Sequence, residues 1–276
     1  MTGPVVVGID GSAHAWHALD WAAEHALLHG LPICLVHGSR AAAPDGAIPA
    51  KEREWLVAER RDLLEEARQY VLKQAPDLTV TTRLVTQEPG HALVSESDRA
   101  ALVAVGSRGQ GGMEGLMFGS VGLHVAAHAR CPVLVVPRSA AYPSNAPDEI
   151  VVGVAERPAE SRLLGWAFAE ASLRGAWLVA VHATGVEFAA PHDRVIQDME
   201  LSEALAGWSS QYPDVRVKPL ISDRTPARAL TEASEHAHMV VVGARPRRGP
   251  SAIALGRTDH AVLHHSRCPV AIVPER

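Results

Sequence analysis

Short apolar segments alternate with longer amphipathic segments along this chain. Apolar runs of strand length predict buried strands, and the segments between them have the periodicity of surface helices. The first half predicts strands near 4–9, 32–37, 79–85, 101–106 and 132–136, and helices near 13–29, 50–74, 90–98 and 119–129. Strands that alternate with helices indicate a parallel sheet covered on both faces by right-handed crossover connections.

The pattern occurs twice. VVVGIDGS at residues 5–12 returns as IVVGVAER at 150–157, an offset of 145 residues. RCPV at 130–133 returns at 267–270, an offset of 137 residues. The second copy is therefore about eight residues shorter, a change that loops and helix ends tolerate.

The repeat sets the domain organisation that we expect. The 276 residues suit two domains of ordinary size, and a hydrophobic content of 47% lets each bury a core. We expect α/β domains at residues 1–138 and 148–276, joined by a Pro-rich linker at 139–147. Each is predicted to be a doubly wound, Rossmann-like domain with a five-stranded parallel sheet in the order 3-2-1-4-5.

Composition narrows the class of partner and the compartment. The net charge of −5, without a long basic run, argues against nucleic acid as the main partner. The apolar runs are too short to span a bilayer, and no signal peptide is visible. Cys34, Cys131 and Cys268 lie in or beside predicted strands without CxxC spacing, as reduced core thiols do. We therefore expect a cytoplasmic protein that binds neither membrane nor nucleic acid.

The most informative motif is GSRGQGGMEGLMFGS at residues 106–120, with the spacing Gly-x2-Gly-x9-Gly-Ser. It follows a predicted strand and precedes a predicted helix. Gly106 and Gly109 permit positive φ and leave no Cβ in the way, so backbone N–H groups can face an anion. Gly119 and Ser120 open the next helix, whose free N–H groups and dipole favour a phosphate.

A second cue points to the same place. In the order 3-2-1-4-5, strands two and three lie on one side of strand one, and strands four and five lie on the other. The topological switch point is therefore between strands one and four, where ligands of doubly wound sheets bind. Asp10 ends strand one and the glycine loop ends strand four. Asp10 is either a ligand residue or a cap of the following helix, a role that Ser12 fills equally well. Arg108 is either a phosphate clamp or a solvated arginine.

These residues resemble the universal stress protein family in its tandem two-domain form. VVVGIDGS, the LVHG after strand two, the glycine loop and the closing CPVLVVP carry the resemblance, which covers nearly the whole chain. It implies an adenine nucleotide alpha hydrolase-like fold with ATP in the crevice. By position, Asp10 lies near the ribose and phosphates, with Mg²⁺ as a possible bridge, and Gly38 meets the adenine. The phosphates are held by Gly106, Gly109, Gly119, Ser120 and Val121.

The chain departs from the family pattern at several positions. The family often has Ser or Thr after Gly-Ser-Val, whereas Gly122 stands here, so one hydroxyl donor is missing. In the second copy Asp10, Gly109 and Ser120 become Ala155, Pro246 and Arg257. We therefore expect one ATP per chain, in the first domain. The alternative is that Arg257, with Arg247 and Arg248, binds a free anion directly.

The resemblance implies a nucleotide-dependent sensor or regulator of stress. One alternative is an interaction scaffold without nucleotide. Another is a slow ATPase or phosphoryl transferase, although no nucleophile–base set or Walker lysine is recognisable. The resemblance also implies a homodimer and protein partners whose identity the sequence leaves open.

Histidines four residues apart suit a zinc site, but no third ligand or HExxH motif is recognisable. The expectation is therefore solvated or core histidines and no metal held by protein side chains alone. The pairs are His25 and His29, His124 and His128, and His260 and His264.

Overall fold

The protein is described by a computed structural model over residues 3–40, 49–109, 118–138, 140, 149–155, 161–185, 191–244 and 255–275. The chain divides into two compact units, Met1–Arg138 and Ser139–Arg276. Most of the linker predicted at 139–147 lies outside the described residues, so its boundaries stay a prediction.

The first unit alternates strand and helix as the hydrophobic pattern predicts. All of its strands are parallel, in the order β3-β2-β1-β4-β5. Its elements are β1 (Val5–Gly8), α1 (Ala13–His29), β2 (Ile33–Gly38), α2 (Ala50–Gln74), β3 (Val80–Val85), α3 (Pro89–Glu96), β4 (Leu102–Gly106), α4 (Ser120–His128) and β5 (Val133–Val136).

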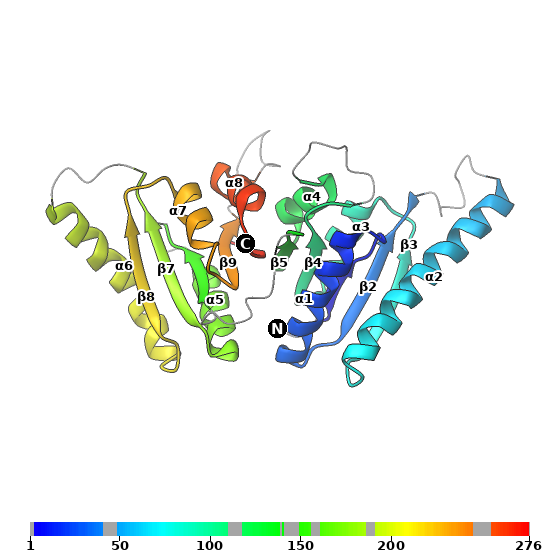
Figure 1. Ribbon diagram of the computed structural model, residues 1–276, viewed down its shortest axis with the longest axis horizontal. Coiled ribbons are helices and arrows are strands. Elements are labelled where there is room, and N and C mark those ends of the chain that lie inside the picture. The colour runs from blue at the N-terminus through cyan, green and yellow to red at the C-terminus, as the bar shows by residue number, and fades with distance from the viewer. Residues whose placement is uncertain are drawn as a thin grey trace. The chain divides into compact units, whose positions relative to one another are not determined.

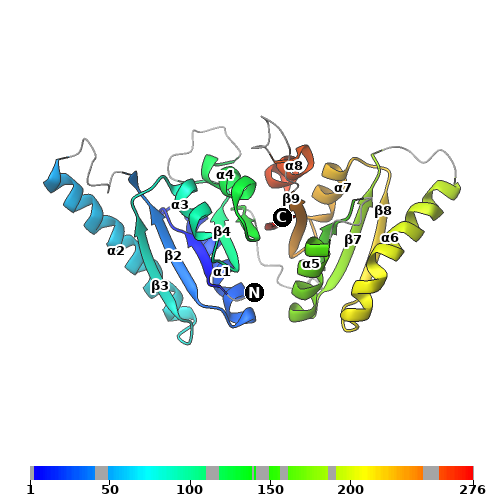
Figure 2. The ribbon, with the colours of Figure 1, turned by 180° about the vertical axis from the view of Figure 1, so that it is seen from behind.

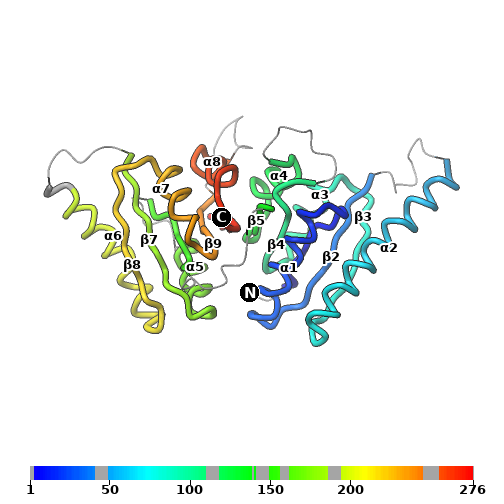
Figure 3. Tube along the Cα trace, viewed as in Figure 1, coloured from blue at the N-terminus to red at the C-terminus, as the bar shows by residue number. Residues whose placement is uncertain are grey.

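The second unit repeats this architecture, and its first two helices are shorter than those of the first unit. Its strands are also parallel, in the order β8-β7-β6-β9-β10, and Figure 3 shows the Cα trace of both units. Its elements are β6 (Glu149–Gly153), α5 (Ser161–Arg174), β7 (Trp177–Ala183), α6 (Pro191–Gln211), β8 (Val217–Ser222), α7 (Pro226–Ala233), β9 (Met239–Ala244), α8 (Arg257–His265) and β10 (Val270–Pro274). The prediction of two tandem α/β units with parallel sheets is confirmed.

Helices cover both faces of each sheet. In the first unit α1 and α2 lie on one face, and α3 and α4 lie on the other (Figures 1 and 2). In the second unit α5 and α6 share one face, and α7 and α8 share the other. Strands buried on both sides need apolar residues at every position, which is why the strands read as continuous valine-rich runs. Val5, Val6 and Val7 of β1 are fully buried.

Local signals set the bounds of α1. The hydroxyl of Ser12 accepts a hydrogen bond from the backbone N–H of Ala15 (3.2 Å) and caps the helix. The helix ends at Gly30, whose φ of +62° is a left-handed conformation that suits glycine. Gly175 has the same φ at the same point of the second unit. The two copies therefore share their turns as well as their hydrophobic pattern.

The three cysteines are buried and unpaired, as the sequence predicts. Burial raises the pKa of Cys131 to about 12 and that of Cys268 to about 11. These thiols are therefore protonated and unreactive near neutral pH. Within the described part of the chain, no helix has the length and apolar content that crossing a bilayer requires.

An aromatic cluster joins α5 to α6 in the second unit. Phe168 of α5 is fully buried, and its ring centroid lies 6.2 Å from that of Trp208 and 5.8 Å from that of Tyr212. Gly165, one turn earlier, leaves room for the Trp208 indole, because a Cβ there would lie 2.8 Å from Trp208 Cη2. Helix α6 is thus held against α5 by the packing of its aromatic rings on Phe168 and over Gly165.

Replacing Phe168 with alanine tests this packing. Removing a buried aromatic ring leaves a cavity, so Phe168→Ala should lower the free energy of unfolding of the second unit by about 3–5 kcal/mol. Urea unfolding followed by circular dichroism measures the change. Val195→Ala, at an exposed position of α6, should change it by less than about 0.5 kcal/mol. Equal effects of the two substitutions would contradict the assignment.

Candidate functional site

A cleft of about 400 Å³ opens at the carboxyl ends of β1 and β4, which are neighbours in the first unit's sheet. The helices that follow these two strands lie on opposite faces of the sheet, which leaves a crevice between them. Every residue that the sequence predicts for the site lines this cleft. They are Asp10, Gly38, Gly106, Gly109, Gly119, Ser120 and Val121.

Asp10 lines the cleft and is not the cap of α1. Its Oδ1 accepts a hydrogen bond from the backbone N–H of Ser12 (2.9 Å), and Ser12 itself caps α1. A Cβ on Gly109 would lie 2.5 Å from Asp10 Oδ2. Glycine at 109 therefore allows the carboxylate to lie directly against the backbone of the loop.

The glycines of the loop are required for clearance rather than for positive φ. The described glycines with positive φ are Gly11, Gly30, Gly175 and Gly185, so that part of the sequence interpretation is wrong for Gly106 and Gly109. A Cβ on Gly106 would lie 2.6 Å from the backbone carbonyl carbon and oxygen of His14. The turn after β4 thus packs tightly against the start of α1.

The start of α4 faces the same cleft. The N–H of Gly119, its N-cap residue, donates to the carbonyl of Ser107 (2.8 Å) and ties the helix to the loop. The N–H groups of the first turn, including those of Ser120 and Val121, have no partner inside a helix. The first turn of α4 contains no acidic residue that would neutralise its positive end. An anion in the cleft would therefore face the N–H groups of the first turn and the positive end of the helix dipole.

Gly122 has a packing reason that the sequence does not reveal. A Cβ at this position would lie 3.1 Å from Phe118 Cε1 and 3.5 Å from the carbonyl oxygen of Gly106. Phe118 is buried. The Phe118 ring packs where the side chain of a Ser or Thr at position 122 would begin, so the glycine that lacks the hydroxyl donor makes room for this ring at the start of α4.

The opposite end of the cleft is apolar and ends at His37. Ile9, Val36, Leu93 and Val105 line it, and sequence reasoning missed them because strand patterns do not reveal which side chains face a crevice. His37 Nδ1 lies 2.6 Å from the carbonyl oxygen of Ile9, so Nδ1–H donates and Nε2 remains an acceptor. Burial lowers the pKa of His37, so the ring is neutral near pH 7. His37 is therefore both a buried residue of β2 and part of the cleft wall.

Positive side chains surround the glycine loop. Arg108 lines the cleft. Burial, followed by the positive charges of Arg108 and Arg138, lowers the pKa of the nearby His14, and Asp10 opposes this effect. Arg138 lies two residues after the end of β5, so the ends of two adjacent strands bring cations near one edge of the sheet. Arg108 and Arg138 therefore favour an anion near the loop, and the carboxylates that line the cleft are those of Asp10 and Glu88.

The second unit has a smaller cleft, of about 250 Å³, at the corresponding edge. Ala155 and Gly243 line it at the positions of Asp10 and Gly106, together with Asp259 and Glu275. Arg257 is exposed and does not line it. Pro246 and the other two arginines, Arg247 and Arg248, lie outside the described residues.

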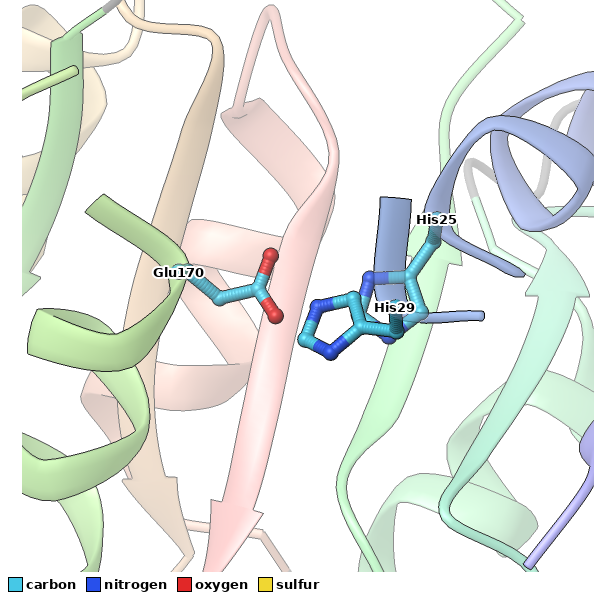
Figure 4. Close-up of side chains that lie close together, drawn as sticks. All are labelled: His25, His29 and Glu170. Atoms are coloured by element: carbon cyan, nitrogen blue, oxygen red, sulfur yellow. The ribbon is translucent and has the colours of Figure 1, made fainter. Parts of the chain in front are cut away.

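The histidine pairs stack on their own helices. Figure 4 shows His25 and His29 on α1, with ring centroids 4.1 Å apart. The rings of the pairs on α4 and α8 lie 4.4 Å apart, and His128 Nδ1–H donates to the carbonyl of His124 (2.7 Å). Glu170, also shown in Figure 4, accepts a hydrogen bond from Arg174 Nε on the same helix, α5 (3.3 Å).

A doubly wound α/β unit that occurs twice in one chain defines a class of tandem Rossmann-like domains. The universal stress protein family matches residues 1–137 and 147–274, and the chain belongs to that family.

Similar proteins extend over the whole chain. The universal stress protein Rv2005c of Mycobacterium tuberculosis is 34% identical over 97% of this chain and 96% of its own length. A universal stress protein of Mycolicibacterium smegmatis is 33% identical over 99% and 97%. The crystal structure of a universal stress protein from Archaeoglobus fulgidus has a TM-score of 0.75 at 18% identity, covering 99% of this chain and 96% of that one. At 18% identity, this similarity shows that the two chains share a fold.

The buried His37 makes the first unit sensitive to acid. Because its folded-state pKa lies below the usual 6.5, its contribution to stability is present above pH 6.5 and is lost as the pH falls towards the folded-state pKa. Urea unfolding at pH 7.5 and 5.5 should show a loss of stability in acid that is smaller in His37→Gln. The same loss in both proteins would contradict this role, since His14 and His124, whose pKa values are also lowered, remain in the variant.

Proposed function

We propose that the first unit binds ATP with Mg²⁺ and that the protein acts as a nucleotide-dependent regulator of a stress response. One observation carries the proposal: seven residues separated by up to 111 positions in the sequence, chosen from the motif and the family resemblance, line a single cleft. That cleft combines an apolar end, a glycine loop and a helix N-terminus, the three features that a base, a ribose and a phosphate chain require.

The two ends of the cleft suit the two ends of the nucleotide. The adenine lies at the apolar end, against Leu93 and the backbone of Gly38. A Cβ on Gly38 would lie 2.7 Å from Pro89 Cα, so strand β2 and helix α3 approach closely there. The acceptor Nε2 of the neutral His37 suits a donor such as an adenine amino group. The phosphates lie over the glycine loop and the start of α4.

Asp10 and the phosphates are the donors proposed for Mg²⁺. Mg²⁺ in nucleotide sites is commonly held by one or two carboxylates together with phosphate oxygens and water. Asp10 Oδ2 lies against the loop at Gly109, where the phosphates are proposed, and fits that donor set. The ion neutralises phosphate charge beside this carboxylate, and Asp10 orients the ribose end.

The class of activity proposed is regulation rather than catalysis. The first alternative, an interaction scaffold without nucleotide, is favoured by the second unit, which lacks an aspartate at 155. The second, a slow ATPase or phosphoryl transferase, requires turnover that is lost in Asp10→Ala. Three buried, unpaired thiols support a cytoplasmic location. A homodimer and further protein partners remain predictions from the family resemblance.

Calorimetric titration with MgATP tests the proposal at Gly109. A methyl group at this position would lie 2.5 Å from Asp10 Oδ2 and displace the carboxylate or the loop. Gly109→Ala should therefore weaken MgATP binding by roughly 10- to 100-fold, the loss expected when a charge-assisted contact is displaced. Gly207→Ala is the matched control, because a Cβ there has no neighbour within 4 Å. It should bind as the unmodified protein does.

The absence of binding decides between the alternatives. No heat with MgATP and no nucleotide in an acid extract of the purified protein would contradict the proposal and favour the interaction scaffold. Equal affinity in Gly109→Ala and the unmodified protein would place the nucleotide elsewhere.

A further inference from the structure

The two clefts are copies of one site whose charged groups lie at different positions. Gly122, the third residue of α4, corresponds to Asp259, the third residue of α8. Arg138, which follows β5, corresponds to Glu275, which follows β10. Both acidic residues line the second cleft. These two substitutions add carboxylates at the start of α8 and after β10, whereas the carboxylates of Asp10 and Glu88 in the first cleft are replaced by Ala155 and Thr225.

Asp259 places a carboxylate at the N-terminus of α8, whereas the first turn of α4 contains no acidic residue. Its Oδ2 accepts a hydrogen bond from the backbone N–H of Gly256, the N-cap residue of α8 (3.2 Å). In the first unit the equivalent N–H, that of Gly119, donates to the carbonyl of Ser107 instead. Asp259 is 9% exposed, so its charge lies inside the cleft rather than in solvent. A carboxylate in the first turn also stabilises the positive end of the helix.

Glu275 places a second carboxylate beside the first glycine of the site. A Cβ on Gly243 would lie 2.6 Å from Glu275 Oε1. In the first unit the backbone of His14 lies at that distance from the equivalent position on Gly106. The second cleft therefore has a carboxylate at each of two places, the helix N-terminus and the strand end, that surround a phosphate in the proposed first site.

We propose that Asp259, assisted by Glu275, is the specificity-determining residue that closes the second cleft to anionic ligands. Its carboxylate takes the position at the helix N-terminus that a phosphate takes in the first unit. The comparison rests on the proposed function of the first unit. In this proposal the carboxylates of Asp259 and Glu275 are a second reason, besides the replacement of Asp10 by Ala155, for expecting no nucleotide in the second unit.

Transferring the acidic residue to the first unit tests the proposal. Gly122→Asp should weaken MgATP binding by roughly 10- to 100-fold, because the new carboxylate competes with phosphate for the start of α4. Gly122→Asn is the matched control, since both side chains press equally on Phe118, and it should bind within about threefold of the unmodified protein. Thermal melting should show no loss of stability in Gly122→Asp relative to Gly122→Asn. Equal binding by the two variants would overturn the proposal.

The reverse change tests the second unit without reference to ATP. In Asp259→Asn/Glu275→Gln, inorganic pyrophosphate should shift the backbone amide resonances of Arg257, Thr258 and residue 259, and it should leave them unshifted in the unmodified protein. Shifts already present in the unmodified protein, or none in the double variant, would overturn the proposal. If the first unit binds no MgATP, the proposed function fails, and the pyrophosphate titration still decides whether the carboxylates close the second cleft.

Discussion

The unpartnered N–H groups at the start of the helix after the fourth strand are the feature on which this account depends. Every α-helix begins with N–H groups that lack an intrahelical partner, and in a doubly wound unit this helix begins beside the switch point of the sheet. The two units satisfy this constraint differently. In α8 the chain supplies a carboxylate from Asp259, whereas α4 has no acidic residue in its first turn and opens on a larger cleft.

Close packing at Gly106 and Gly109 brings the glycine loop against Asp10 and the start of α1, and so forms the first cleft. A Cβ on Gly106 would collide with the backbone of His14, and one on Gly109 would collide with the carboxylate of Asp10. The ends of β1 and β4 are therefore close enough for a carboxylate and a loop backbone to share one ligand. Strands buried on both faces fix these ends in register, Val5 to Val7 of β1 pairing with Leu102 to Ala104 of β4. The core thus determines the spacing of the site.

The periodicity and motifs of the sequence were sufficient to predict the strands and helices and the residues of the glycine loop that line the cleft. The runs at 4–9 and 101–106 became adjacent parallel strands, and parallel strands necessarily bring Asp10 and the glycine loop to one edge. Contacts made in three dimensions were not predictable in this way. The bond from His37 to Ile9 joins residues 28 positions apart, and Phe118 explains Gly122 only through ring packing. Asp259 lies outside the glycine motif, two residues after the position that corresponds to Ser120, so the motif gives no signal for it.

Counting bound nucleotides on the intact chain tests the central claim most directly. Native mass spectrometry in the presence of MgATP reports each binding event as a separate mass. We predict a single ATP on each chain, held by the first unit, with no second ATP at concentrations that saturate the first. Two ATP molecules on each chain would contradict the claim that the carboxylates of the second cleft exclude the nucleotide. A chain that remains free of ATP would contradict the assignment of the first cleft.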